Sequence, residues 1–270
     1  DPEQVASKVT DKTKAIIPVH LFGLCADMDA IKSAIPKHVK ILEDAACAAG
    51  AKYKGRYAGT LGDAASFSFH PRKSITTGEG GMVTTQENSL YTLMDQMRNH
   101  GATISEEQRH LGPKPYILPD FNLLGFNYRM TDLQGSIGLV QLEKLDSFID
   151  ERKQWASWYR DQLSDIKWLR LPQEPENGRH GWQSFVTYVN PELAPLSRNE
   201  IMEKLQELGV STRPGTHAIH MLSLYKNRFN IKPEDFPNAR DCDKNTMAIP
   251  LHNRMREEDY NYVVACLKGF

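Results

Sequence analysis

The first half of the chain contains short, almost uninterrupted apolar runs that we expect to be strands. Runs of this kind are typical of a sheet that is covered on both faces, where neither side of the strand meets water. They occupy residues 15–22, 39–42, 64–69 and 81–85.

A segment with helical periodicity separates the first two runs. Met28, Ile31 and Ile35 fall on one face of a helix, and Asp27 stands where an N-cap is expected. The order strand, helix, strand is typical of a parallel sheet with crossover helices. The pattern therefore predicts an α/β fold for this half.

After residue 86 the pattern becomes mainly helical. Residues 88–99 predict a helix, and residues 102–128 are rich in Gly, Pro and polar groups, which predicts a long loop of the functional or disordered kind. Thr131 and Gln134 form a capping box that starts a helix reaching about Leu163. Its expected core positions are Leu133, Ile137, Val140, Leu142 and Leu145.

The remainder has an α+β pattern after a boundary near residue 150. Residues 172–181 form a polar linker, and residues 185–189 alternate as a half-buried strand does. A second capping box, Ser197 with Glu200, starts a helix that stops at Gly209, and a last helix is expected at 257–267.

The amino-acid composition argues against several classes of function. The 270 residues include 33 basic and 34 acidic side chains, and this balance argues against a general affinity for nucleic acid or anionic membrane. No run approaches the roughly 18 apolar residues of a membrane span. None of the four cysteines forms a CxxC pair, so we expect no zinc site, no dense disulfide framework and a reduced, cytoplasmic setting.

The densest cluster of chemically useful residues lies between Ser66 and Gly81. Serines and threonines, glycines and one lysine share this segment, and hydroxyls with free amides suit a phosphate. Lys73 can be a counter-charge to the phosphate or a nucleophilic amine that forms a Schiff base, or it can be a solvated lysine on a tight turn. The segment matches neither the P-loop nor the dinucleotide fingerprint.

A second cluster follows the apolar run at residues 39–42. Glu43 and Asp44 end this run, and in open α/β sheets ligands bind outside the carboxyl ends of the strands. Asp44 can orient a substrate or hold a protonated ring nitrogen there. Alternatively, it caps the segment that follows.

Histidines raise the question of a metal. His217 and His220 have HxxH spacing, and His100 and His110 lie in the long loop, but no carboxylate or cysteine stands at a recognised ligand spacing beside them. We expect surface or core histidines and no metal. No GxSxG nucleophile elbow is present either.

Eight short motifs follow one another along nearly the whole chain, and in this order they resemble the DegT/DnrJ/EryC1/StrS aminotransferases. These are pyridoxal-phosphate enzymes that mostly make amino sugars on nucleotide carriers. The motifs are Glu43–Ala46, Gly55–Arg56, Gly59–Asp63, Phe67–Gly81, Arg98–Gly101, Gly125–Asp132, Gly215–Ala218 and Ile249–Leu251.

The resemblance implies fold type I: a large, mostly parallel α/β cofactor domain, residues 1–150 here, and a smaller C-terminal α/β domain, residues 151–270. It also implies roles at matching positions. Lys73 would bind pyridoxal 5'-phosphate covalently and later move the proton, Asp44 would pair with the pyridine nitrogen, and Ser68 would bind the phosphate.

Two further positions carry expectations from the family. Asn127 would reach the phosphate of the neighbouring subunit's cofactor, so the resemblance implies a homodimer with shared active sites. Cys47 stands beside the cofactor ring, where family members often carry Gln or His. It either changes the contact with the ring hydroxyl or is a small buried residue.

The activity implied is transfer of an amino group from glutamate or glutamine to a nucleotide-linked keto sugar, with acceptor-site candidates His70, Arg213, His217 and His220. Relatives that remove a sugar hydroxyl characteristically replace the lysine with His, and Lys73 is retained here. Alternatives are amination of cyclitols or antibiotic precursors and a non-catalytic binding protein on the same scaffold.

Family members extend further on the N-terminal side. Their extra part supplies sheet strands, a phosphate-binding turn with Gly and an aromatic residue that stacks on the ring. We therefore expect Asp1 to lie partway into the cofactor domain and the chain to be a fragment. Such a fragment should bind the cofactor poorly and expose an unpaired sheet surface.

Overall fold

The computed structural model describes residues 1–114 and 116–270, and their packing divides them into two compact units. Unit 1 consists of residues 1–145 together with 177–179. Unit 2 consists of residues 146–176 and 180–270. Residue 115, which belongs to the long loop predicted from the sequence, lies outside the described residues.

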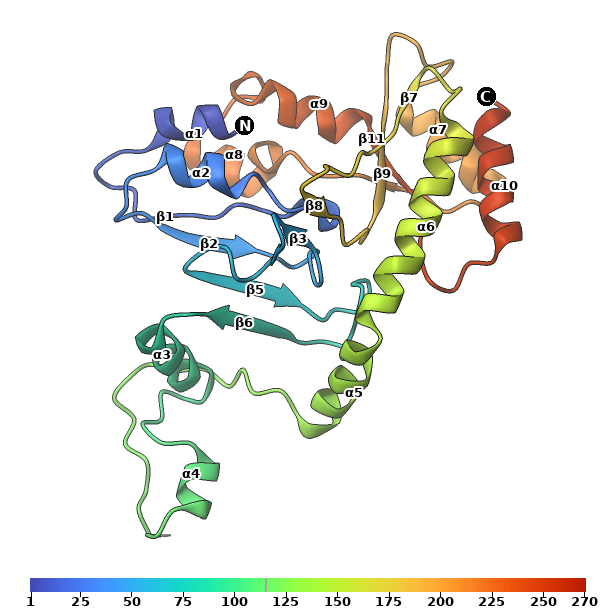
Figure 1. Ribbon diagram of the computed structural model, residues 1–270. Coiled ribbons are helices and arrows are strands. Elements are labelled where there is room, and N and C mark those ends of the chain that lie inside the picture. Colours follow the sequence, from blue (N-terminus) through green and yellow to red (C-terminus); the bar gives the residue numbers. More distant parts are fainter. Residues whose placement is uncertain (115) are drawn as a thin grey trace. The chain divides into compact units, whose positions relative to one another are not determined.

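Unit 1 is built on a four-stranded sheet with the strand order β1-β2-β5-β6 (Figure 1). Strands β1, β2 and β5 run parallel, whereas β6 runs antiparallel to β5. The predicted α/β fold is therefore confirmed, with a mostly parallel sheet. The bounds are β1 Ala15–Ile16, β2 Lys40–Asp44, β5 Ala64–Ser68 and β6 Gly81–Thr85.

The crossover between β1 and β2 contains helix α2 (Met28–Ala34), as the periodicity predicts. The Asp27 carboxylate caps it by accepting a hydrogen bond from the Ala30 amide at 3.0 Å. Met28 and Ile31 pack against Ile41 of β2 in one apolar cluster. A second cluster of small residues lies just beyond β2 and consists of Ala45, Ala48, Ala51 and Ala58.

The predicted polar linker at 172–181 contains a strand. β8 (Gly178–Arg179) pairs with β3 (Lys52–Tyr53), which also pairs with β4 (Arg56–Tyr57) in a small antiparallel sheet. This pairing is the reason that residues 177–179 belong to unit 1.

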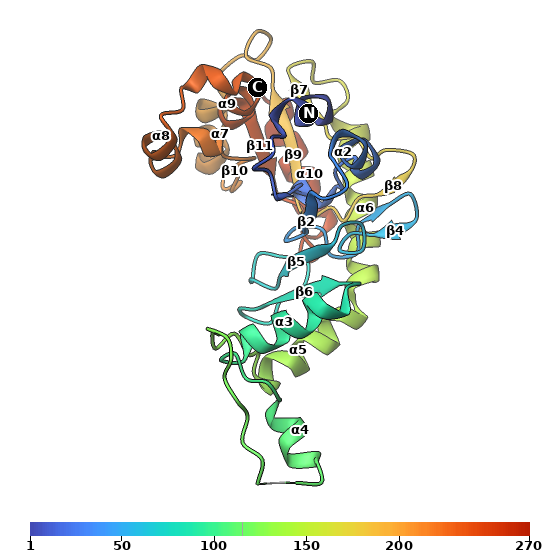
Figure 2. The same ribbon diagram turned by 90° about the vertical axis from the view of Figure 1, so that its left-hand side faces the viewer.

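Of the other helices of unit 1, α1 precedes the main sheet, η1 lies between β1 and β2, and the rest follow β6. Helix α3 packs against β6, and the segment that carries α4 extends away from both (Figures 1 and 2). The predicted loop therefore contains a short helix. The bounds are α1 Pro2–Lys8, η1 Leu21–Gly23, α3 Asn88–Arg98, α4 Glu106–Leu111 and α5 Asp132–Glu143.

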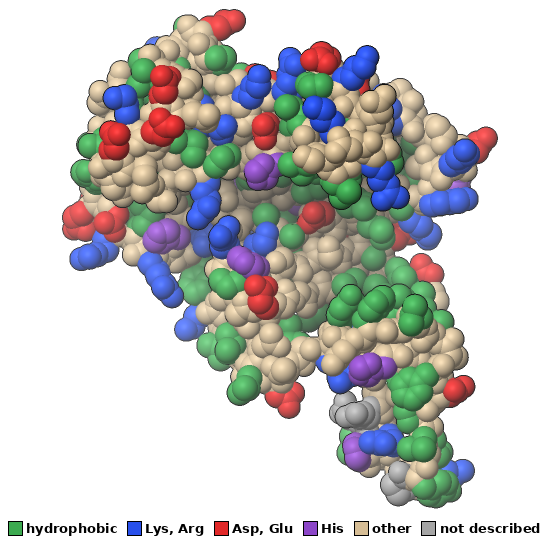
Figure 3. Space-filling view, turned by 180° about the vertical axis from the view of Figure 1, so that it is seen from behind, with side chains coloured by type: hydrophobic (Ala, Val, Ile, Leu, Met, Phe, Trp, Pro, Cys, Tyr) green, Lys and Arg blue, Asp and Glu red, His purple; other side chains and the backbone are tan. Residues whose placement is uncertain are grey.

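Helix α5 departs from the sequence prediction in two ways. Its capping box of Thr131 and Gln134 is present, but the helix ends at Glu143 and α6 (Leu145–Leu163) begins after Lys144. Of the five predicted core residues only Leu145 is buried, and Leu133 is 78% exposed. Within the described chain, little packs over the apolar positions of α5. Hydrophobic side chains also lie at the surface of the segment that carries α4 (Figure 3).

Unit 2 has an antiparallel sheet in the order β10-β11-β9-β7. Its core also takes side chains from α6, α7 and α10, while α9 packs on β9 and β10. Strand β9 (Phe185–Val189) is almost fully buried rather than half-buried. Phe185 and Val189 enter this core, and α9 packs against the strand.

The bounds of the remaining elements of unit 2 are β7 Leu169–Arg170, β10 Arg213–Pro214, β11 Thr246–Ile249, α7 Arg198–Glu207, η2 Ile219–Met221, α8 Ser223–Phe229, η3 Pro233–Asp235, α9 Pro237–Asn245 and α10 Glu257–Lys268. Helix α7 starts at the predicted capping box and stops before Gly209, which adopts φ +79°. Among the described helices of both units, none has the length and apolar character needed to cross a membrane.

Candidate active site

The candidate site lies in unit 1 at the carboxyl ends of two neighbouring parallel strands. Asp44 is the last residue of β2 and pairs in register with Ser66, and Ser68 is the last residue of β5. Because parallel strands end at the same edge of a sheet, the two side chains stand at one edge. The chain leaves Ser68 into the loop that carries Lys73.

Lys73 is held by a turn and directed towards the segment that follows β2. Its amide donates to the His70 carbonyl at 2.9 Å, which closes the turn. Its amine Nζ lies 3.1 Å from Sγ of Cys47, three residues after Asp44. Both side chains are half-buried. The structure therefore brings the predicted amine and the predicted cysteine together.

Asp44 is fixed through its backbone. Its amide donates to the Pro18 carbonyl at 2.9 Å, and its carbonyl accepts from the His20 amide at 3.0 Å. Oδ1 accepts a hydrogen bond from the Ala46 amide at 3.1 Å, which is the capping interaction considered as an alternative. Within the described residues, Oδ2 makes no hydrogen bond, so one oxygen is left for a ligand.

The loop after β5 closes on itself. The Phe69 amide donates to the Gly80 carbonyl at 2.9 Å, and the Phe69 carbonyl accepts from the Thr77 amide at 3.1 Å. At Gly81 a Cβ would lie 2.6 Å from the Phe67 carbonyl oxygen, so a side chain there would collide with β5. The Ser68 hydroxyl accepts from the His70 amide at 3.3 Å.

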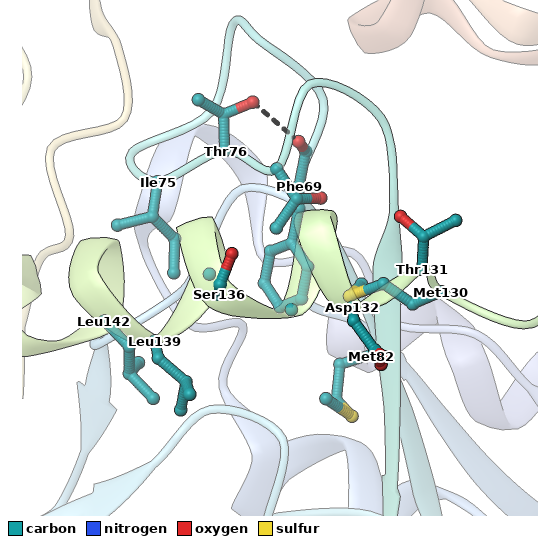
Figure 4. Close-up of a pocket in the computed structure, with 13 residues that line it drawn as sticks. Phe69, Ile75, Thr76, Met82, Met130, Thr131, Asp132, Ser136, Leu139 and Leu142 are labelled. Carbon is teal, nitrogen blue, oxygen red and sulfur yellow. Dashed lines mark hydrogen bonds between the residues drawn. The ribbon is translucent and has the colours of Figure 1, made fainter.

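A pocket of about 540 Å³ opens beside this loop (Figure 4). Its walls are mainly apolar and come from the loop, β6 and α5, with Phe69, Ile75, Met82 and Leu139 among them. Asp44, Cys47 and Lys73 are not among the residues that line this pocket.

The other predicted residues of unit 1 are placed as follows. His70 accepts from the Arg72 amide at 3.1 Å through Nδ1, and its Nε2 lies 3.8 Å from a carboxylate oxygen of Glu79. Asn127 is exposed and forms an isolated bridge with Asn99. The roles of His70 and Asn127 stay predictions.

The remaining acceptor-site candidates belong to unit 2. Arg213 and His217 are exposed, and Nδ1 of His217 lies 3.9 Å from Oδ1 of Asp243. His220 is buried, with its Nε2 3.3 Å from the Pro233 carbonyl oxygen and its ring against Phe236. His220 thus fills a local core. A role for any of the three in acceptor binding stays a prediction.

Sequence reasoning missed one feature beside the site. Glu43 points away from water and pairs with His20 at 2.9 Å, both side chains being fully buried. The only sequence signal was the adjacent carboxylate pair. Among the described residues, no three His, Cys, Asp or Glu side chains are arranged to hold a metal ion.

Comparison with known proteins identifies the family. Residues 1–268 match the DegT/DnrJ/EryC1/StrS aminotransferase family. The chain belongs to this family. The GDP-perosamine synthase of Caulobacter vibrioides is 35% identical over 269 residues, which cover 99% of this chain and 68% of that protein. The spore coat polysaccharide biosynthesis protein SpsC of Bacillus subtilis is 34% identical over 270 residues, which cover 99% of this chain and 69% of that protein.

Solved structures agree with this result. The PLP form of the putative sugar aminotransferase Spr1654 from Streptococcus pneumoniae superposes with a TM-score of 0.88 at 26% identity, covering 100% of this chain and 70% of that chain. The predicted fold type I is confirmed. The DegT-family member described here is a pyridoxal-phosphate-dependent aminotransferase of amino-sugar biosynthesis.

The residues at the strand ends fit the cofactor by the chemistry of their donors and acceptors. A primary amine at Lys73 suits an aldehyde, and the unbonded Oδ2 of Asp44 suits a protonated ring nitrogen. The hydroxyl of Ser68 stands at the neighbouring strand end, where it can serve a phosphate.

Proposed function

We propose that this aminotransferase moves an amino group from glutamate or glutamine to a keto sugar carried on a nucleotide, with Lys73 as the catalytic amine. One observation supports it above the others: Nζ of Lys73 lies 3.1 Å from Cys47, in the segment directly after Asp44. The likeness to a GDP-perosamine synthase supports a nucleotide-linked acceptor.

When bound, pyridoxal phosphate supplies an electron sink that stabilises the negative charge left on the substrate carbon after proton loss. Asp44 keeps a proton on the ring nitrogen. At ~4 Å and an effective dielectric near 20, opposite charges attract by about 4 kcal/mol before desolvation is counted. This attraction is large enough to keep the ring nitrogen charged at neutral pH.

Lys73 has two tasks in this proposal. Its amine would hold the aldehyde group of the cofactor and, when free, would take a proton from the substrate carbon and return it at another atom. Cys47 orients the amine through the contact at Sγ. Ser68 anchors the phosphate end, which holds the ring in place without taking part in proton transfer.

The proposal includes a homodimer in which Asn127 serves the neighbouring subunit's cofactor. The exposed position of Asn127 is compatible with this role. The apolar surface of α5 supports a second copy as its partner, because large exposed apolar patches mark protein contacts. All four cysteines are free, which supports a cytoplasmic location.

The substitution Lys73→Ala tests the proposal. Titrated with excess pyridoxal phosphate, the unchanged protein should turn yellow and the variant should not, because the covalent link to Nζ is lost. The exposed Lys32→Ala on α2 is the matched control and should behave as wild type. Amino transfer that persists in Lys73→Ala would rule out the assigned catalytic amine.

A substrate panel separates the alternatives. Keto-sugar nucleotides should accept nitrogen from glutamate or glutamine, whereas cyclitol ketones should not. The reverse result would make the protein a cyclitol aminotransferase. Bound cofactor without transfer to any acceptor would indicate a non-catalytic binding protein.

A further inference from the structure

We propose that Glu43 and His20 are positioning residues that fix Asp44 against the ring nitrogen of the cofactor. This inference rests on the proposed function, since it concerns how Asp44 meets the ring. Neither residue touches the candidate site directly. The pair acts through the backbone of Asp44 and through the segment 59–62.

Glu43 is buried, and its carboxylate accepts four hydrogen bonds. Oε2 accepts from Nε2 of His20 at 2.9 Å and from the Gly59 amide at 2.7 Å. Oε1 accepts from the amides of Leu61 and Gly62, both at 2.6 Å. Each oxygen thus takes two donors, which satisfies the carboxylate and leaves it no freedom to rotate.

The partners of His20 determine where its proton resides. Nδ1 accepts a hydrogen bond from the Ala26 amide at 3.2 Å, so this nitrogen carries no hydrogen. Nε2 therefore carries the hydrogen atom and donates a hydrogen bond to the Glu43 carboxylate. The imidazole is neutral, and the pair as a whole keeps the negative charge of Glu43.

The same histidine holds Asp44. The backbone amide of His20 donates to the Asp44 carbonyl while its ring donates to Glu43, the residue before Asp44. Main chain and side chain together close a ring of covalent bonds and hydrogen bonds around this point of β2. The backbone of Asp44 cannot shift along the strand without breaking one of these bonds.

The segment 59–62 connects the pair to β5. At Gly59 a Cβ would lie 2.4 Å from the ring of Phe67, and at Gly62 it would lie 2.6 Å from the Ile41 carbonyl oxygen. The two glycines therefore let the backbone approach both strands closely enough to reach Glu43. Phe67 directly precedes Ser68, so the pair is also connected to the strand that leads to Lys73.

The hydrogen bonds to Glu43 favour the negatively charged form of its carboxyl group. Burial would raise the pKa of Glu43, but the hydrogen bonds from His20 and the three amides outweigh it and hold the pKa below its usual value. Burial and the charge of Glu43 raise the pKa of the neighbouring Cys25 thiol to about 12. A fixed anion thus lies one residue from Asp44.

The test compares two ligands: pyridoxal phosphate and its carbocyclic analogue, in which CH replaces the ring nitrogen. Wild type should prefer the natural cofactor. In Glu43→Gln the amide NH₂ faces donors on whichever side it turns, so the pair is disrupted. The charge-assisted hydrogen bond between Asp44 and the ring nitrogen would then be misaligned. The preference for pyridoxal phosphate over the analogue should fall about tenfold, with the affinity for the analogue nearly unchanged.

Control variants separate positioning from general damage. Asp44→Asn should abolish the preference, because it removes the contact with the ring nitrogen. His20→Gln keeps a donor for Glu43 and should retain more of the preference than His20→Leu. Equal weakening of both ligands in Glu43→Gln would show a merely structural role and overturn the inference, while leaving the proposed function intact.

Amide hydrogen exchange of the cofactor-free chain gives a second measurement that needs no ligand. Glu43→Gln, or His20→Leu if the first variant does not fold, should speed exchange at residues 44–46 as well as 59–62, with unit 2 unchanged. Faster exchange confined to 59–62 would overturn the inference. A wild type that binds both ligands equally would instead count against the proposed function.

Discussion

His180 in unit 2 is a buried histidine whose surroundings favour its neutral form. Its Nδ1 accepts from the Trp182 amide at 2.8 Å, and its ring stacks on that indole with centroids 4.1 Å apart. Burial lowers the pKa of His180 from 6.5 to about 4, although Glu174 acts in the opposite direction. The folded state therefore resists protonation of this ring.

This shift predicts a pH dependence of stability. Between pH 6.5 and 4 the unfolded chain binds a proton that the folded chain does not, so stability present above pH 6.5 is lost as the pH falls. From pH 7 to pH 5 the loss at this group should be about 2 kcal/mol. All four tryptophans, at 155, 158, 168 and 182, belong to unit 2, so indole fluorescence during urea unfolding measures it.

The matched variant is His180→Asn, whose side-chain oxygen can still accept from the Trp182 amide. It should lose less stability than wild type over the same pH range, because it has no group to titrate. Parallel curves for the two proteins would contradict the assignment of this pH dependence to His180.

The site residues most easily predicted from sequence are those that their neighbours along the chain single out. Lys73 lies in a segment of glycines and hydroxyls, and Asp44 ends an apolar run, so both positions stand out. The partnership of Glu43 with His20 is different, because 23 residues separate the two and only the sheet brings them together. No spacing along the chain indicates such a pair.

At the scale of elements, the capping box of α7 offers a simple test. Ser197→Ala removes the hydroxyl that accepts from the Glu200 amide and should lower the free energy of unfolding of unit 2 by about 1 kcal/mol. Urea unfolding followed by tryptophan fluorescence measures this change.

Two variants complete that experiment. Ser197→Asp restores an acceptor at the N-cap and should recover most of the loss. Thr131→Ala removes the corresponding cap from α5, which belongs to unit 1, and should leave the tryptophan signal unchanged. Equal stability of Ser197→Ala and wild type would show that the cap contributes nothing.

Elements with a clear period or cap were predictable, and most of the two-residue strands were not. The apolar run at 81–85 coincides with β6, and both capping boxes mark real helix starts. β7, β8 and β10 have two residues each, too few to show alternation. For α5 the pattern identified apolar positions, but it cannot say whether another element covers them.

At the scale of the whole molecule, the exposed side of α5 predicts self-association. Leu139 is 67% and Ile137 is 49% exposed, and burying such side chains against a second copy is favourable. Leu139→Lys should therefore raise the dissociation constant of the dimer about tenfold or more, as measured by sedimentation velocity over a range of concentrations.

Leu193→Lys is the matched control, since Leu193 is 58% exposed but lies in unit 2, away from α5 in the sequence. It should sediment as wild type does. A protein that stays monomeric at all concentrations, with or without Leu139→Lys, would contradict the proposed partner of α5.

The pairing of β8 with β3 has a consequence for protein engineering. The polypeptide passes from one unit to the other at 145–146, at 176–177 and again at 179–180. A chimera that joins residues 1–145 to the second half of another family member would thus receive a foreign edge strand for its small sheet. Recombination between relatives should succeed best when Gly178 and Arg179 are inherited together with Lys52 and Tyr53.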